Sequence, residues 1–200
     1  MARKVKHLKK KPLVLICAEG GSNSTEFKSL KRFSCRDLRI KCCSGNDTDV
    51  NGMVANLIKY IDKEDIKNED NCRIFLMIDT DLSKERIKQI QSIEKLCKKH
   101  NIEIITSSPT LEIWFLLHFR KDKLNFDNSL SVKNELNKVK TKCGLSNEDS
   151  FYTFLLNKNN IASAIENAKS LLVVENNASI YFNNPHTMIY KIIEAINYLK

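Results

Sequence analysis

Two uninterrupted apolar runs limit what this chain can fold into. Residues 13–18 (LVLICA) and 74–78 (IFLMI) have the length of a strand and contain no polar side chain. A strand that is apolar at every position has both of its faces covered, as in a parallel sheet enclosed by helices. Apolar residues also recur at helical spacing over 54–61 and 87–97. The runs therefore predict an α/β protein built around a buried sheet.

Two further segments extend the predicted sheet. Residues 38–43 (LRIKCC) alternate apolar and charged side chains, which indicates a half-exposed strand at an edge, and residues 102–105 (IEII) indicate a short strand. The order is then β-α-β-α-β-α-β, which favours an α/β sandwich with a mainly parallel four-stranded sheet flanked by helices. We expect this core to occupy 12–120, after a basic tail over 1–11.

The rest of the chain, 121–200, is expected to form a helical C-terminal extension packed on the core. Just before it, PTLEIWFLLHF is predicted as a helix with Ser108 as its cap and Pro109 at its first position. This segment is apolar nearly all round, which predicts that most of it is buried. Four more helices are expected over 131–142, 150–157, 161–174 and 185–199.

Carboxylates follow both apolar runs directly. Glu19 ends the first run, and Asp79 and Asp81 end the second. Ligands of parallel α/β sheets bind at the carboxyl ends of the strands, so these three side chains can meet at one edge. Residues i and i+2 of an extended backbone project to the same side, which would place Asp79 beside Asp81. Nearby carboxylates repel one another and need a cation, and hard oxygen ligands favour Mg²⁺ or Mn²⁺ over zinc.

A purely structural interpretation competes with a metal site. Asp81 can cap the next helix, and Asp79 can bind to the backbone. Glu112 lies in the first turn of its predicted helix, where a carboxylate is stabilised whatever its role. His118, near the end of that helix, fits a buried core position, and Glu26 fits the last position of a capping box. Each of these residues therefore has a structural as well as a functional reading.

The positive charge is concentrated at the N-terminus. The net charge is +9, and a run of six basic residues without an acid carries two thirds of it. This run is either a solvated tail or an arm that binds nucleic acid, since cationic side chains release counterions from phosphates. Its members are Arg3, Lys4, Lys6, Lys9, Lys10 and Lys11.

Several common classes are excluded. The chain has no GxxxxGK[ST] motif, so it is not a P-loop ATPase, and it has no GxGxxG. No apolar run reaches the roughly 20 residues that a membrane span requires. The seven cysteines are odd in number and never spaced CxxC, which argues against a zinc site or disulfide framework and predicts a reducing cytoplasm. A metal-dependent phosphoryl-transfer or phosphate-binding site is the remaining interpretation.

Three passages together carry a resemblance to a known family: LVLICAEGGSNSTEF, IFLMIDTDLS and SSPTLEIWFLLHF. Glu-Gly after the first strand and Asp-x-Asp after a later one resemble the Toprim fold of topoisomerases, primases and OLD-family nucleases. More narrowly, the chain resembles the RloB family of small Toprim-like proteins from prokaryotic phage-defence loci. The segments IASAIENAKSL and NPHTMIYKIIEAI are similar to the closing helices of that family. The resemblance thus spans nearly the whole chain beyond the basic tail.

The resemblance implies roles for individual residues. Glu19 would be a metal ligand or general base, Asp79 and Asp81 would be metal ligands, and Glu112 would be an additional acidic group. Metal ions held there would orient a water against a phosphodiester and stabilise the leaving oxygen. The basic residues, with the N-terminal run among them, would hold the nucleic acid. Supporting positions implied by the same passages are Gly20, Thr25, Glu26 and His118.

The leading hypothesis is a cytoplasmic Mg²⁺- or Mn²⁺-dependent Toprim-type nuclease that acts in antiviral abortive infection. Its substrate is DNA or RNA such as tRNA, and the resemblance implies an AAA-type ATPase, encoded nearby, as partner. The alternative is a non-catalytic Toprim-fold subunit that binds a partner. A primase-like polymerase is a further rival, against which stands the lack of zinc-ribbon cysteines. No pattern indicates an oligomeric state.

Overall fold

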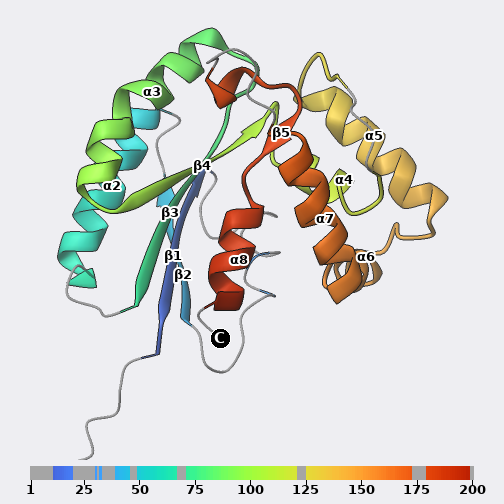
Figure 1. Ribbon diagram of the computed structural model, residues 1–200, viewed down its shortest axis with the longest axis horizontal. Coiled ribbons are helices and arrows are strands. Elements are labelled where there is room, and N and C mark those ends of the chain that lie inside the picture. Colours follow the sequence, from blue (N-terminus) through green and yellow to red (C-terminus); the bar gives the residue numbers. More distant parts are fainter. Residues whose placement is uncertain are drawn as a thin grey trace, which may run out of the picture.

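The two apolar runs form adjacent central strands of one sheet (Figure 1). The computed structural model describes residues 11–19, 30, 32, 39–45, 49–66, 71–120, 125–172 and 179–198. Within them the sheet has five strands in the order β2-β1-β3-β4-β5. The first four are parallel, and β5 is antiparallel to β4. The strands are β1 (Leu13–Glu19), β2 (Arg39–Gly45), β3 (Cys72–Asp79), β4 (Ile102–Ser108) and β5 (His186–Thr187).

Helices cover both faces of the sheet, which confirms the predicted α/β architecture with a mainly parallel sheet. In Figure 1 α2 and α3 lie on one side of the strands, and α4 to α8 lie on the other. The first pair is α2 (Val50–Lys63) and α3 (Lys84–Lys99). The second group is α4 (Glu112–Leu116), α5 (Ser129–Lys142), α6 (Glu148–Leu155), α7 (Lys158–Ser170) and α8 (Tyr190–Tyr198). A short 3-10 helix at Ile180–Phe182 contacts α3, where the Tyr181 hydroxyl donates to Glu94 at 2.8 Å.

Alternation along β1 divides the core into two apolar clusters. Side chains 13, 15 and 17 pack with α2 and α3, whereas side chains 14, 16 and 18 pack with the C-terminal helices. The second cluster joins Phe75 of β3 to Trp114 of α4 and Ile192 of α8. The helical extension and the sheet therefore share one apolar core. No helix of the described residues combines the length and apolar character that crossing a membrane requires.

The structure corrects the prediction around the fourth strand. Ser108 is the last residue of β4, not a helix cap, and Pro109 follows it through a cis peptide bond. The helix that was predicted from Pro109 begins at Glu112. The strand β4 continues to Ser108 because Ser107 and Ser108 pair with Thr187 and His186 of β5. The sequence around Ser108 gives no sign of this pairing with a distant segment. The segment 185–189, predicted as the start of a helix, instead contains β5 at His186–Thr187, and α8 begins at Tyr190.

Side-chain hydrogen bonds hold β5 against β4. Ser107 Oγ lies 2.9 Å from Thr187 Oγ1, and Thr106 Oγ1 lies 2.8 Å from His186 Nε2. The other ring nitrogen of His186 donates to the carbonyl of Asn183 at 2.8 Å. All four side chains of the two pairs are buried, and burial lowers the pKa of His186. The C-terminal segment thus closes this edge of the parallel sheet.

The strand order contains a topological switch point between β1 and β3. The chain leaves β1 to form β2 on one side and returns to form β3 on the other side. The next strand after β1 therefore lies on one side of the β1–β3 pair, and the next strand after β3 lies on the other side. In open α/β sheets this is where ligands bind.

Candidate functional site

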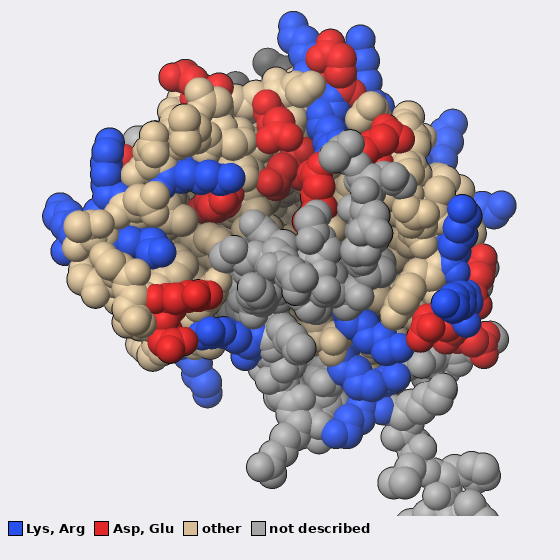
Figure 2. Space-filling view, turned by 180° about the vertical axis from the view of Figure 1, so that it is seen from behind, with Lys and Arg blue, Asp and Glu red and all other residues tan. Residues whose placement is uncertain are grey.

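Carboxylates from both strands reach the switch point. Glu19 is the last residue of β1, and Asp79 is the last residue of β3. The parallel register pairs Ala18 with Met77, so the two strands end at the same edge. Figure 2 shows one group of acidic side chains near the upper middle of the molecule, besides others at the lower left and right, and the parallel strands run upward in Figure 1.

A threonine hydroxyl joins two of the carboxylates. Thr110 Oγ1 lies 2.9 Å from Asp79 Oδ2 and 2.6 Å from Glu112 Oε2. A hydroxyl has one proton to donate, so the two contacts are both hydrogen bonds only when one carboxyl is protonated. Burial raises the pKa of Asp79 to about 7, and the charges of Glu112 and Asp81 add to the effect. The carboxyl groups of the site therefore take up a proton near neutral pH. This proton reduces the excess of negative charge around Asp79.

Asp81 lies beyond the strand, in a tight turn. Its φ is +50° and that of Leu82 is +56°, a left-handed conformation that costs about 1 kcal/mol or more in a residue with a side chain. The expectation that Asp79 and Asp81 project from one extended backbone is therefore wrong. Asp81 is held from two other segments instead: its N–H donates to the Pro109 carbonyl at 3.0 Å, and its Oδ1 accepts from Ser129 Oγ at 3.1 Å.

The competing structural reading of Asp81 is also wrong. The cap of α3 is Ser83, whose hydroxyl accepts from the Arg86 N–H at 3.2 Å. Thr80, fully buried, donates its hydroxyl to Ser108 at 2.8 Å and ties the turn to β4. The carboxylate of Asp81 is thus not used for helix capping.

Glu19 is paired with an arginine that sequence reasoning missed. Arg86 Nη2 donates to Glu19 Oε2 at 2.8 Å, and Arg86 Nε donates to the carbonyl of Asp79 at 3.4 Å. The side chain of Arg86 is 11% exposed, against 39% for Glu19. Arg86 lies in the first turn of α3, where the helix dipole disfavours a cation. A cation at this unfavourable helix position was the one feature of the sequence that pointed to a carboxylate partner for Arg86.

A lysine of α5 is the second residue that was missed. Lys133 Nζ lies 3.5 Å from Glu112 Oε1 and is 53% exposed. With the Ser129–Asp81 hydrogen bond, this contact places the first two turns of α5 against the carboxylates. Nothing in the local pattern of α5 indicates this, because the two segments are separated by a loop.

The family comparison agrees with the earlier resemblance. A family model described as RloB-like protein matches residues 14–196. The chain belongs to the RloB-like family. No curated protein and no solved structure gives a significant match. Glu19, Asp79, Asp81 and Glu112 all lie within the matched segment of this RloB-like protein, whereas the basic tail at 1–11 lies outside it.

His118 belongs to the apolar lobe rather than to the carboxylate group. Its Nδ1 donates to the Trp114 carbonyl at 2.9 Å, and the two rings meet edge to face at 4.9 Å. Burial lowers the pKa of His118 to about 4, which keeps the ring neutral at physiological pH. Its Nε2 is buried without a hydrogen-bond partner among the described residues. The structure places no carboxylate of the site in contact with it.

Several predicted positions fall outside the described residues. They are Gly20, Thr25, Glu26, Lys4, Lys6, Lys9 and Lys10. Of the basic run only Lys11 is described, and it is exposed.

The donor chemistry of the site fits a hard divalent cation, but the present arrangement is open. Asp79, Asp81 and Glu112 offer carboxylate oxygens, which suit Mg²⁺ or Mn²⁺. Within the part of the chain that is described, no group of three His, Cys, Asp or Glu side chains is close enough to hold a metal ion. Glu19 is turned to Arg86 instead. Binding a cation through Glu19 requires this ion pair to exchange.

Proposed function

We propose that this RloB-like protein is a metal-dependent Toprim-type nuclease that hydrolyses phosphodiester bonds in antiviral abortive infection. The observation that carries the proposal is the half-buried Asp79, which shares the Thr110 hydroxyl with Glu112 beside the switch point. Uncompensated negative charge at the carboxyl edge of a parallel sheet is costly to keep. It is typical of sites that take up a cation and a phosphate.

In this proposal Glu19, Asp79 and Asp81 hold Mg²⁺ or Mn²⁺. The cation supplies Lewis-acid activation of water and stabilisation of the leaving oxygen. Glu112 accepts or returns a proton through Thr110, whose hydroxyl already contacts both carboxyls. Without a cation, the raised pKa of Asp79 lets the group of Asp79, Thr110 and Glu112 hold a proton near neutral pH, and a cation bound by Asp79 would displace that proton.

One observation favours the second candidate, a non-catalytic subunit that docks a partner. The Glu19–Arg86 and Glu112–Lys133 pairs give two of the four carboxylates a basic partner within the protein itself. A partner such as an AAA-type ATPase, as the family resemblance implies, would then supply the activity or switch the site on. The two candidates predict different effects of replacing a carboxylate by a neutral amide. A nuclease loses its activity, whereas a docking subunit keeps its function.

The test is cleavage of supercoiled plasmid, linear duplex DNA and total tRNA by the purified chain with Mg²⁺, Mn²⁺ or EDTA. We expect cation-dependent cutting of one substrate class, lost in Asp81→Asn but kept in Glu166→Gln, an exposed carboxylate on α7. The same variants are compared in a phage plaque assay with the neighbouring ATPase present. A scaffold keeps its protection in Asp81→Asn and cuts nothing under any condition, which would overturn the nuclease.

Arg86→Gln is expected to tighten Mn²⁺ binding by about tenfold, or about 1.4 kcal/mol. The substitution frees Glu19 from a 2.8 Å ion pair and removes a positive charge beside Asp79. Titration of Mn²⁺ by electron paramagnetic resonance measures the affinity. Arg73→Gln is the matched control, since the Arg73–Glu103 pair lies at the other ends of the strands. Unchanged or weaker binding in Arg86→Gln would show that Arg86 does not compete for Glu19.

A further inference from the structure

The outer edge of β4 is paired over only part of its length. Strand β5 pairs with the last two residues of β4, and the Met188 N–H donates to the Thr106 carbonyl at 2.9 Å. Backbone groups of successive residues point to alternate sides of a strand, so the N–H and carbonyl of Ile104 and the carbonyl of Ile102 face outward as Thr106 does. Within the described residues, no backbone group pairs with these three. Residues 102–105 therefore present an open sheet edge.

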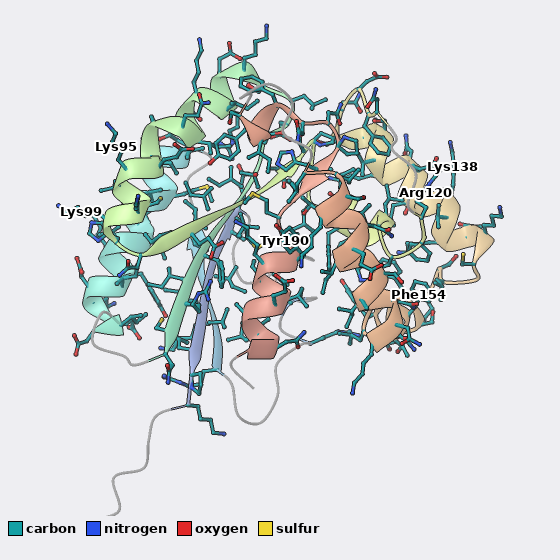
Figure 3. The ribbon with its side chains drawn as sticks, in the orientation of Figure 1. Lys95, Lys99, Arg120, Lys138, Phe154 and Tyr190 are labelled. Carbon is teal, nitrogen blue, oxygen red and sulfur yellow. The ribbon has the colours of Figure 1, made fainter. Side chains whose placement is uncertain are left out.

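A surface hollow of about 490 Å³ runs along this open edge. Figure 1 shows β4 running between α3 and α8. In Figure 3, Lys95 and Lys99 of α3 lie on one side of the strand and Tyr190 of α8 lies on the other. The apolar part of the lining comes from β4 and from its neighbours on both sides, and consists of Cys97, Ile102, Ile104, Tyr181 and Met188. Unpaired backbone groups and apolar side chains thus face the same hollow.

The two walls of the hollow differ in chemistry because side chains alternate along β4. Ile102 and Ile104 point to the side of α3, where Tyr181 packs with the same apolar cluster. Glu103 points to the side of α8, where it pairs with Lys191 at 3.2 Å and with Arg73 at 3.0 Å. An occupant of the edge meets apolar groups on one face and charged groups on the other, as one strand with alternating side chains does.

This edge lacks the devices that keep sheets from pairing with other chains. Proteins protect an open edge with lysine, proline or a bulge, whereas 102–105 reads IEII and the charge of its one acid is already paired. Two exposed large apolar side chains adjoin lining residues in the chain: Leu96 precedes Cys97, and Phe182 follows Tyr181. Exposed apolar groups around a pairing edge are typical of a protein-binding surface.

A second copy of this chain is a poor occupant of the edge. Antiparallel pairing of two copies through Ile102 and Ile104 would set Glu103 directly opposite its own counterpart. Like charges directly opposite one another destabilise a pair of strands. A different chain is free of this repulsion, and a polar side chain at that position can meet the Glu103–Lys191 pair.

We propose that the open edge of β4 binds an extended segment of a partner protein, which joins the sheet as a further strand. Its apolar side chains face α3, and its polar side chains face α8. Main-chain hydrogen bonds then give affinity, and the two walls select the alternating side chains. The surface is separate from the carboxylates, because Ile102 is in register with Ile74 at the start of β3, whereas Asp79 is in register with Ser107. The inference does not depend on the proposed nuclease.

The test is selection of binders from a displayed library of random decapeptides on the purified full chain in EDTA. The comparison protein is Ile104→Pro, which removes the outward N–H and places proline where an edge strand tolerates it. We expect enriched peptides to be apolar at every second position and to bind the wild type at least about tenfold more tightly than Ile104→Pro. Leu130→Ala, at an exposed apolar position on α5, is the control and should bind like the wild type.

Backbone methylation of the best peptide tests strand addition on the unchanged protein, so the result stands even if Ile104→Pro melts at a lower temperature. A methyl group on an amide nitrogen removes its hydrogen. We expect a loss of about tenfold or more for the amides that face β4, which recur at every second residue, and less than about twofold for those between.

Three outcomes would overturn the proposal. They are no enriched peptide on the wild type, equal binding to wild type and Ile104→Pro, and methylation effects without a period of two. Sedimentation of the wild type and Ile104→Pro covers the other occupant, because a dimer that Ile104→Pro dissociates would assign the edge to a second copy instead of a partner. Loss or absence of nuclease activity changes none of these readouts.

Discussion

Asp79→Asn is expected to reduce cation-dependent cleavage by about a thousandfold or more and, at the same time, to stabilise the protein above pH 7. Loss of cleavage follows from losing a carboxylate that holds the cation and that contacts the Thr110 hydroxyl shared with Glu112. The gain in stability follows from burial, because an ionised Asp79 is costly to keep inside the folded protein. Few substitutions of a purely structural residue combine these two effects.

The sign of the pH dependence follows from the two pKa values. Asp79 loses its proton near pH 3.8 in the unfolded chain and near pH 7 in the folded protein. Between these values the folded state holds more protons, so the free energy of unfolding falls as pH rises. The difference between these two pKa values corresponds to a loss of about 4 kcal/mol, which is nearly complete above pH 7. Below pH 3.8 the carboxyl is protonated in both states, and the ionisation of Asp79 no longer affects the free energy of unfolding.

Urea denaturation of wild type and Asp79→Asn at pH 5 and pH 8 measures how much the ionisation of Asp79 lowers the free energy of unfolding. The difference between the two proteins is the quantity to follow, because burial lowers the pKa of His118 and His186 and makes stability fall towards acid pH. The variant should gain about 3 kcal/mol on the wild type between pH 5 and pH 8. Glu166→Gln serves as the control. A variant that is less stable than wild type at pH 8 would contradict the energetic cost of an ionised, half-buried Asp79.

Phe75→Ala is expected to lower the free energy of unfolding by about 3 to 5 kcal/mol, a large part of the stability of a domain of this size. Phe75 is fully buried in the middle of β3, where its ring belongs to the cluster that joins the sheet to Trp114 and Ile192. Its loss leaves a cavity between the sheet and the C-terminal helices. The sheet and the C-terminal helices should therefore unfold together, at a lower urea concentration than in the wild type.

Urea unfolding followed by far-ultraviolet circular dichroism and by Trp114 fluorescence checks this expectation. We expect coincident transitions that shift together. Phe182→Ala provides the comparison, since Phe182 is 54% exposed and its loss should cost less than about 0.5 kcal/mol. A shift below about 1 kcal/mol, or separate transitions for the two probes, would show that the sheet and the helices do not share one core.

Much of the architecture could be predicted because it is encoded in local patterns. The run 74–78 is apolar at every position because β3 is covered on both faces. The half-polar pattern predicted over 38–43 falls, from residue 39 onward, in β2, an edge strand of the described sheet. Helices α2, α3, α5, α6 and α7 overlap the segments with helical spacing. Burial imposes a period of two or 3.6 on any chain, and such a period is readable without knowing what packs against it.

The candidate site could be predicted only in part, for a physical reason. The sequence by itself determined which carboxylates follow the strands, since Glu19 and Asp79 end apolar runs whatever the strand order. The tertiary structure alone decided what those carboxylates contact. Arg86 reaches Glu19 from 67 positions away in the sequence, and Thr110 reaches Asp79 from 31 positions away.

The same distinction explains β5 and the turn at Asp81. A two-residue strand has almost no pattern of its own, and β5 exists because the open edge of β4 offers backbone groups that must be paired. Asp81 is drawn out of the extended conformation by Pro109 and Ser129. Periodicity along the chain determined which segments form strands and helices, and therefore which strands end in an acidic residue. Contacts between distant segments, which depend on where the crossovers place each element, decided the charge balance of the site.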